Sequence, residues 1–171
     1  YKERRLERRK QFLRLRERYV RRGKTLVYVD ECGFAPFATR RYAYAPKGRR
    51  VYGLTSGQRQ PRTSLIAAHM EGKMSVPFLF EGTCDTEVFN FWLEHLLCPH
   101  LTTAHVVILD NAAFHKSPDT MRLIEQAGAT LLFLSPYSPD FNPIEHDFAA
   151  LKKNREYNEH ETLDTIIKHY Q

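Results

Sequence analysis

The chain has 171 residues, of which 42% are hydrophobic, and a formal net charge of +6 at pH 7. This length favours a single domain, and the apolar content is sufficient for a full core, which excludes a chain that is disordered throughout. No apolar run is long enough to cross a membrane and no apolar signal core lies near the first residue, so we expect a cytoplasmic protein.

The first 24 residues form a basic segment. They contain twelve of the 26 Lys and Arg residues but only three of the 20 Asp and Glu residues. Residues 2–22 lack proline and glycine and predict a helix, which Gly23 ends. A basic helix of this kind is an electrostatic partner for DNA. The alternative is a solvated helix whose charge only maintains solubility.

The next part of the chain predicts strands separated by turns. Runs of β-branched and aromatic residues indicate strands over residues 25–30, 49–54, 64–69 and 75–81. Residues 31–48 are rich in aromatic residues, arginine and proline, and they predict a loop with a short hairpin arm.

Helices and strands alternate in the second half of the chain. Strands are predicted over residues 105–110 and 130–134. Caps, prolines and glycines indicate helices between Asp85 and Pro99, from Ser117 to Gly128, from Pro143 onwards, and around residues 163–170. Strands followed by alternating helices and strands are typical of an α/β fold with a mixed central sheet flanked by helices.

Three acidic residues stand at the ends of these elements. Asp30 and Asp110 each follow four hydrophobic residues of a predicted buried strand, and Glu145 lies in the first turn of the helix from Pro143. Ligands of α/β sheets bind beyond the carboxyl ends of the strands, so neighbouring strands would bring Asp30 and Asp110 to one crevice. Gathered carboxylates repel one another unless cations lie among them, so the pattern predicts a divalent-metal site.

Each acid also has a simpler structural explanation. A polar strand end, a turn and a helix capping box would account, respectively, for Asp30 with Glu31, Asp110 with Asn111, and Glu145 with Asn142. The three together are harder to attribute to chance. His115, five residues after Asp110, either supports the site or is a buried structural histidine.

Two Mg²⁺ ions held by three carboxylates would support phosphoryl transfer. Such ions lie roughly 3.5–4 Å apart, activate a water or a 3′-hydroxyl, and stabilise the leaving oxygen. The sequence has no glycine-rich phosphate loop, so no nucleotide cofactor is expected.

Three motifs resemble the DDE transposases of the mariner-like superfamily, and most closely its bacterial insertion-sequence branch. They are DECGF at residues 30–34, ILDNAAFHKS at 108–117 and SPYSPDFNPIEH at 135–146. The resemblance implies a ribonuclease H-like fold, Mg²⁺ with Mn²⁺ as a substitute, and cut-and-paste DNA transposition. It also implies that Asp30, Asp110 and Glu145 are the catalytic and metal-binding acids, with 34 residues between the last two, and that Asn111 and His115 support them.

The same resemblance implies DNA as the partner, both as element ends and as target, with a homodimer in the synaptic complex of a nucleoid-associated bacterial protein. We expect residues 1–24 to be a basic helical arm or linker and residues 25–171 to be the catalytic domain. The basic residues expected to contact DNA are Arg4, Arg5, Arg8, Arg9, Arg21, Arg22, Lys47, Arg49 and Arg50.

Members of the resembled family carry helix-turn-helix domains before the catalytic domain, and this chain opens in what resembles their linker. We therefore expect a fragment, a split product or a truncated copy. Two alternative functions remain open from the sequence. One is a ribonuclease H-like nuclease that cuts without strand transfer, and the other is a non-catalytic DNA-binding remnant that modulates a full-length transposase.

Overall fold

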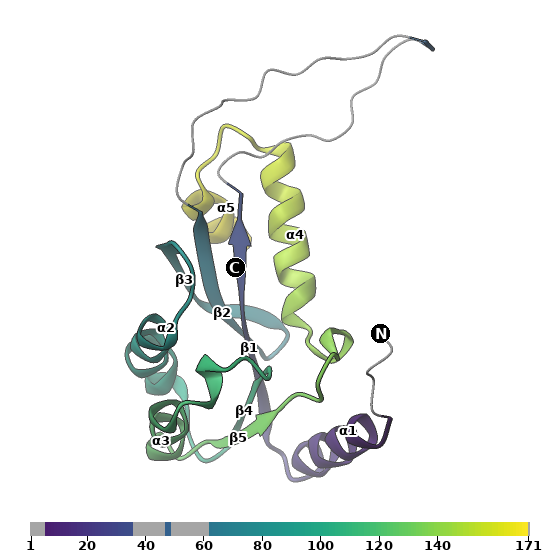
Figure 1. The fold of residues 1–171 in the computed structure, drawn as a ribbon, viewed down its shortest axis with the longest axis vertical. Helices are drawn as coiled ribbons and strands as arrows, with labels where there is room; N and C mark the ends of the chain where they lie inside the picture. Colours follow the sequence, from purple (N-terminus) through teal and green to yellow (C-terminus); the bar gives the residue numbers. More distant parts are fainter. Residues whose placement is uncertain (1–5, 36–46, 49–61, 171) are drawn as a thin grey trace.

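The structure is a computed structural model that describes residues 6–35, 47–48 and 62–170. Its centre is a five-stranded mixed sheet in the order β3-β2-β1-β4-β5 (Figure 1). The strands are β1 (Thr25–Phe34), β2 (Thr63–Met70), β3 (Lys73–Glu81), β4 (His105–Leu109) and β5 (Thr130–Phe133). β1 pairs antiparallel with β2 and parallel with β4, so the expected mixed sheet is confirmed.

Helices cover both faces of this sheet (Figure 1). They are α1 (Leu6–Arg21), α2 (Thr86–Trp92), α3 (Pro118–Gln126), α4 (Ile144–Tyr157) and α5 (Leu163–Tyr170). Two of the predicted N-caps are confirmed. The Asp85 side chain accepts a hydrogen bond from the Val88 N–H at 2.9 Å, and the Ser117 hydroxyl accepts one from the Thr120 N–H at 3.0 Å.

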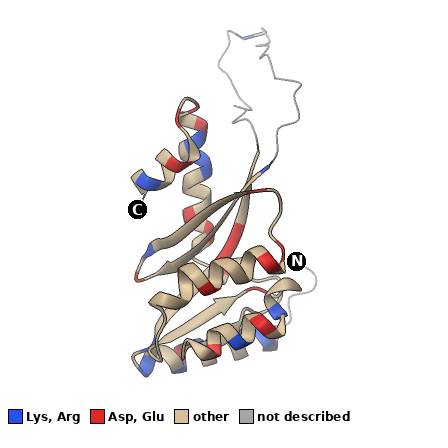
Figure 2. Cartoon of the chain, turned by 90° about the vertical axis from the view of Figure 1, so that its left-hand side faces the viewer, with Lys and Arg blue, Asp and Glu red and all other residues tan. Residues whose placement is uncertain are grey.

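The two-residue alternation of β1 divides its side chains between two cores. Val27 and Val29 belong to the core beneath α2 and α3, which includes the fully buried Trp92. Cys32 and Phe34 point to the opposite face and pack with α4 and α5. Charged residues lie mainly on the helices, and the strands are largely uncharged apart from an acidic stretch in β1 (Figure 2).

β1 is longer than the sequence predicts. We expected a strand over residues 25–30 followed by a loop, but β1 continues to Phe34. Its pairing with β4 ends at Tyr28, whereas its pairing with β2 runs on to the Phe34–Thr63 pair. Asp30 therefore lies inside a strand, at the point where that strand leaves its parallel neighbour. The predicted strand over residues 49–54, and all but residues 47–48 of the hairpin arm, lie outside the described residues.

The helix predicted between Asp85 and Pro99 is not a single α-helix. After α2 the chain forms a π-helical turn over Leu93–Leu97 and a 3₁₀ helix over Cys98–His100. The π-helical turn keeps Leu93 and Leu97 fully buried on the same side. Across the described ranges, no helix is long and apolar enough to cross a membrane.

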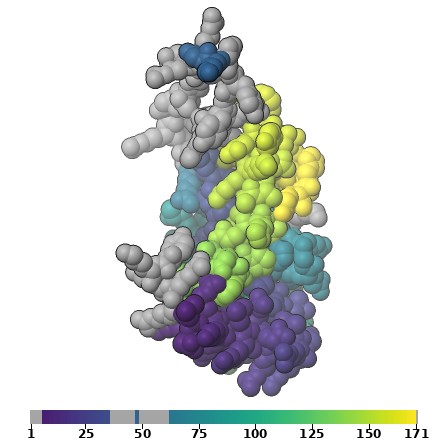
Figure 3. Space-filling view, turned by 90° about the vertical axis from the view of Figure 1, so that its right-hand side faces the viewer, coloured from purple at the N-terminus to yellow at the C-terminus, as the bar shows by residue number. Residues whose placement is uncertain are grey.

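α1 packs against the domain around Phe12, its buried residue, with Leu13 and Tyr19 partly buried beside it. Phe12 is 3% exposed and shares a small core with Tyr28, Val106 and Ile108 of the sheet. In the space-filling view α1, in purple, lies against the green segment that leads into α4 (Figure 3). The remaining residues of α1 are mostly exposed, as expected for a basic helix. The division of the chain at residue 24 stays a prediction.

Candidate active site

A cavity of about 460 Å³ lies where β1 and β4 separate. The last parallel pair between these strands is Tyr28 with Ile108, and Asp30 and Asp110 each come two residues later in the chain. Both acids line the cavity together with Glu145, from the first turn of α4. The fold therefore brings the three acids expected from the sequence to one cavity.

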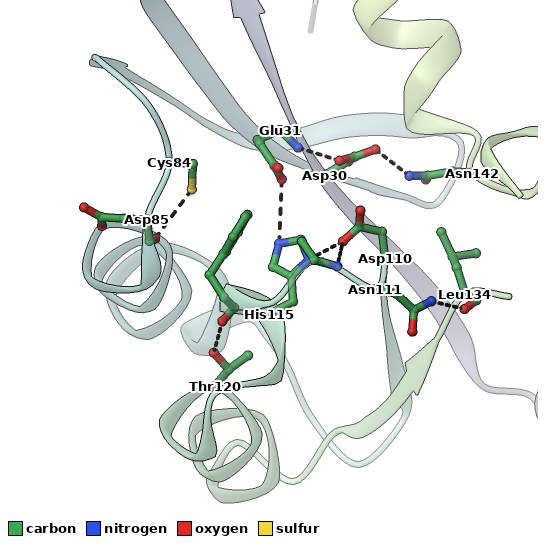
Figure 4. A network of polar contacts seen from close by, with 12 residues as sticks. Asp30, Glu31, Cys84, Asp85, Asp110, Asn111, His115, Thr120, Leu134 and Asn142 are labelled. Atoms are coloured by element: carbon green, nitrogen blue, oxygen red, sulfur yellow. Dashed lines mark hydrogen bonds and ion pairs between the residues drawn. The ribbon is translucent and has the colours of Figure 1, made fainter. Parts of the chain in front are cut away.

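Both oxygens of the Asp30 carboxylate accept hydrogen bonds (Figure 4). Oδ1 accepts from the Glu31 N–H at 2.8 Å, and Oδ2 accepts from Asn142 Nδ2 at 2.9 Å. The pKa of Asp30 is nevertheless raised to about 7. Burial is the largest cause, the charges of Asp110 and Glu145 add to it, and the hydrogen bonds oppose it. Asp110 and Glu145 thus both lie within electrostatic reach of Asp30.

Asp110 is held in the ionised form by its neighbours. Its Oδ1 accepts hydrogen bonds from the Ala112 N–H at 2.8 Å and from His115 Nδ1 at 2.6 Å. Burial acts to raise the pKa of Asp110, but these bonds and the positive charge of Lys116 outweigh burial, so the pKa is lowered. Asp30 and Asp110 therefore face the same cavity with opposite pKa shifts.

The His115 imidazole lies between Asp110 and Glu31 (Figure 4). The imidazole is fully buried and lies 4.4 Å from the Phe89 ring and 4.3 Å from the Phe114 ring, measured between centroids. Its Nδ1 bonds Asp110, and its Nε2 lies 3.6 Å from Glu31 Oε2. Within the described part of the chain, neither this Nε2 nor this Oε2 has a hydrogen-bond partner. The direct contact of Nδ1 with Asp110 supports the expectation that His115 assists Asp110.

Glu31 belongs to the site although the sequence suggested only a polar residue beside Asp30. The pKa of Glu31 is raised to about 8, first by burial and then by the charges of Asp30 and Asp110. The alternation of β1 turns Glu31 to the face opposite Asp30, towards His115. No local signal in the sequence marked this role, because β1 is extended past residue 30 by pairing with β2.

Asn111 lines the cavity and bonds the backbone rather than one of the three acids. Its Nδ2 donates to the Leu134 carbonyl at 2.5 Å, which joins the chain after β4 to the chain after β5. Asn111 lines the cavity, but the hydrogen bond it makes is to the neighbouring backbone and not to Asp110. It fixes the wall of the cavity on which the loop of residues 135–142 begins.

Asn142 is the second residue that the sequence did not assign to the site. The capping-box explanation of Asn142 and Glu145 is wrong, because Pro143 is the residue at the N-cap and, among the described residues, no side chain caps α4. The Asn142 side chain is 3% exposed and donates to Asp30 instead. Its contact was not readable locally, because Asp30 lies more than a hundred residues earlier in the chain.

The basic residues expected to bind DNA have separate outcomes. Arg8 and Arg21 are exposed on α1, Arg22 is exposed in the turn that follows it, and Lys47 is exposed in a turn. Arg9 is half-buried and makes internal contacts with Ser138 and Asp140, so the structure gives it a contact other than DNA. The remaining four residues lie outside the described ranges: Arg4, Arg5, Arg49 and Arg50.

Residues 25–167 match the family described as DDE superfamily endonuclease. The chain belongs to this family. The match begins at the first residue of β1 and includes all three acids of the cavity, whereas α1 precedes it.

Solved structures of the Mos1 mariner transposase resemble this DDE-family chain. The Mos1 strand transfer complex aligns with a TM-score of 0.67 and 22% identity over 87% of this chain and 47% of that chain. The paired-end complex with Mg gives 0.68 and 21% over 86% and 48%. The Mos1 catalytic domain with Raltegravir and Mn gives 0.63 and 18% over 97% and 79%. Likeness at these identities shows the fold, and the expected ribonuclease H-like fold is confirmed.

A sequence relative covers part of the chain. The Sinorhizobium fredii protein y4pE/y4sA, described as uncharacterized, is 34% identical over 88 residues, which are 50% of this chain and 63% of that protein. The chain thus spans less than two thirds of this relative, and about half of each Mos1 chain solved with transposon ends.

Proposed function

We propose that this DDE-family chain is the catalytic domain of a transposase that cuts DNA and joins the freed 3′ ends to target DNA, using Mg²⁺ or Mn²⁺. The observation that carries the proposal is the shared cavity of Asp30, Asp110 and Glu145. The resembling structures add support. Mos1 was solved in complex with a transposon end, as a strand transfer complex, and in paired-end complexes with Mg or Mn.

The donor groups of the cavity suit a hard cation. All three acids offer carboxylate oxygens, which Mg²⁺ and Mn²⁺ prefer. The raised pKa of Asp30 reports burial and repulsion between carboxylates, and a cation would relieve the repulsion. Over the ranges that the structure describes, no three acidic, histidine or cysteine side chains lie close enough to enclose an ion. The fit therefore rests on the shared cavity and on donor chemistry.

The roles of the chain's own residues follow from their contacts. Asp30, Asp110 and Glu145 would hold the cation, with Asn142 orienting Asp30 and His115 orienting Asp110. When bound, the cations would activate the attacking hydroxyl and stabilise the leaving oxygen of a phosphodiester.

DNA would reach this cavity with help from the basic surface of α1. The exposed Arg8, Arg21 and Arg22 suit contacts with the phosphate backbone, which fix the position of the DNA without reading its sequence. Because one active site must act on each end of an element, we further propose that two copies act together in the complex that holds both ends.

A strand-transfer assay tests the proposal. The substrates are duplexes with pre-cut 3′ ends, taken from the inverted repeats that flank the reading frame, and a supercoiled target plasmid with Mg²⁺ or Mn²⁺. We expect joined products that disappear with EDTA and fall by at least about 100-fold in Asp110→Asn. Asp119→Asn, an exposed aspartate paired with Arg122, is the matched control and should retain activity.

Each result of this assay has a defined meaning. Cleavage without joining would indicate a nuclease and would overturn the proposed strand transfer. Equal silence of the wild type and Asp110→Asn, with DNA binding intact in both, would indicate the non-catalytic remnant. Joined products that survive in Asp110→Asn would contradict the assigned site.

A further inference from the structure

Arg9 of α1 makes contacts that a DNA-binding arginine does not need. Its guanidinium donates two hydrogen bonds to the Asp140 carboxylate, at 3.0 Å and 2.5 Å, and a third to Ser138 Oγ at 2.7 Å. The guanidinium carbon also lies 3.9 Å from the centre of the Phe141 ring. With a side chain only 14% exposed, Arg9 contacts three residues of one loop, Ser138, Asp140 and Phe141.

These contacts fix the orientation of the Arg9 guanidinium as well as pairing its charge with Asp140. The two parallel bonds to Asp140 use the planar fork of arginine, which lysine cannot reproduce. One turn further along α1, the Phe12 ring stacks on Phe141 with centroids 5.7 Å apart and planes 15° apart. α1 therefore grips the loop by an ion pair and an aromatic stack at adjacent positions.

The loop that α1 holds, residues 138–142, leads to two residues of the cavity, Asn142 and Glu145. Its backbone is tightened by hydrogen bonds from the Phe141 N–H to Ser138 O at 3.1 Å and from the Asn142 N–H to Pro139 O at 2.8 Å. The Asn142 side chain then bonds Asp30, and the Glu145 N–H donates to Asn142 O at 3.3 Å. A continuous set of contacts thus runs from Arg9 to Asp30 and to Glu145.

We propose that Arg9 is a positioning residue, which anchors the loop of residues 138–142 to α1 and so sets where Asn142 and Glu145 stand in the cavity. This inference rests on the proposed function, because it concerns carboxylates that would hold a cation. It assigns an active-site task to α1, which precedes the part of the chain that matches the family. The space-filling view shows α1 against this segment (Figure 3).

Cation affinity separates positioning from simple charge effects. Removing a positive charge near acidic ligands should, by electrostatics alone, tighten the binding of Mn²⁺. If Arg9 positions the ligands, Arg9→Gln should instead weaken it. Arg9→Lys keeps the charge but loses the fork, so it should also weaken binding.

The experiment measures Mn²⁺ affinity by calorimetry and amide hydrogen exchange of residues 138–145, at a temperature where circular dichroism shows every variant folded. We expect Arg9→Lys and Arg9→Gln to weaken Mn²⁺ binding about 10-fold and to speed exchange in the loop. Arg14→Gln, which removes an exposed arginine from the same helix, should change neither. Arg9→Gln combined with Asp140→Asn should cost less than the sum of the two single variants, because both break the Arg9–Asp140 ion pair.

The outcomes keep the two proposals apart. Unchanged loop exchange in Arg9→Lys would overturn the anchoring of the loop, whatever the cation does. Normal or tighter Mn²⁺ binding by both Arg9 variants, with a wild type that binds, would overturn the positioning role. A wild type that binds no Mn²⁺ would overturn the proposed function, and loop exchange would then judge Arg9 by itself.

Discussion

At the residue scale, two adjacent acids of β1 serve opposite faces of the sheet. Asp30 meets Asn142 on the face of α4, and Glu31 meets His115 on the face of α2 and α3. His115 also bonds Asp110, so one imidazole lies between the half-buried Glu31 and an acid of the cavity. The burial of His115 between Phe89 and Phe114 leaves the ring little freedom to turn.

The two nitrogens of His115 can be tested separately. The amide of asparagine reaches about as far as Nδ1, and the amide of glutamine about as far as Nε2. We predict that His115→Gln, which loses the contact with Asp110, lowers Mn²⁺ affinity about 10–100-fold, and that His115→Asn lowers it less. Calorimetric titration of the two folded variants checks this. The reverse order would assign the important contact to Glu31.

At the scale of elements, a polar network ties α4 and α5 to β2. Asp147 of α4 is 8% exposed and lies 2.7 Å from His69 Nδ1, and it accepts a hydrogen bond from the Tyr170 hydroxyl at 2.8 Å. Since α5 is a single short helix, its last turn depends on this bond and on Ile166 and Ile167 beneath it. The network begins in the same helix as Glu145, which comes two residues before Asp147.

Tyr170→Phe should destabilise the fold by about 1 kcal/mol at neutral pH, the usual net worth of such a bond. The pKa of Tyr170 is raised to about 12, by burial first and then by the bond to Asp147. Unfolded tyrosine titrates near pH 10, so the folded chain holds this proton more tightly. The stabilisation is complete below pH 10 and disappears as the pH rises through about 12.

Urea unfolding of the wild type and of Tyr170→Phe between pH 7 and 12 measures this difference. Tyr157→Phe is the matched control, because Tyr157 is 67% exposed. A gap between wild type and Tyr170→Phe that is as large at pH 12 as at pH 7 would show that the stabilisation does not come from the hydroxyl proton.

At the scale of the whole molecule, the cavity is connected to α1, a helix that lies outside the region matched to the family. The helix buries Phe12 against the sheet and holds the loop before α4 through Arg9. Arg8, Arg14, Arg18 and Arg21 remain exposed at the surface, where they would suit the DNA of the proposed function. One helix can thus present charge on one side and support the active site on the other.

Phe12→Ala should therefore lower the free energy of unfolding by about 3 kcal/mol, the lower end for emptying a buried phenylalanine site. Leu6→Ala on the same helix should cost less than about 0.5 kcal/mol, since Leu6 is 69% exposed. Urea denaturation of the chain provides both values. Equal and small effects would show that α1 is a separate arm, as the division at residue 24 supposed.

Local patterns account for most of the elements and for the three acids. The alternation and caps predicted each described strand and helix, because they depend on residues two to four positions apart in the chain. They misjudged the end of β1, since its extension depends on pairing with residues of β2 that lie 29 to 35 positions further along the chain. They also could not separate Arg9 from the other arginines of a uniformly basic helix.

By itself the sequence determined the α/β class, the order of the elements and which three acids line the cavity, namely Asp30, Asp110 and Glu145. Hydrophobic periodicity and motifs are local properties that can be read from the sequence directly. Tertiary structure alone decided that Asn142 bonds Asp30, that Glu31 faces His115 and that Arg9 grips Asp140. These contacts join residues far apart in the chain, and they form only because strand pairing and helix packing bring those segments together.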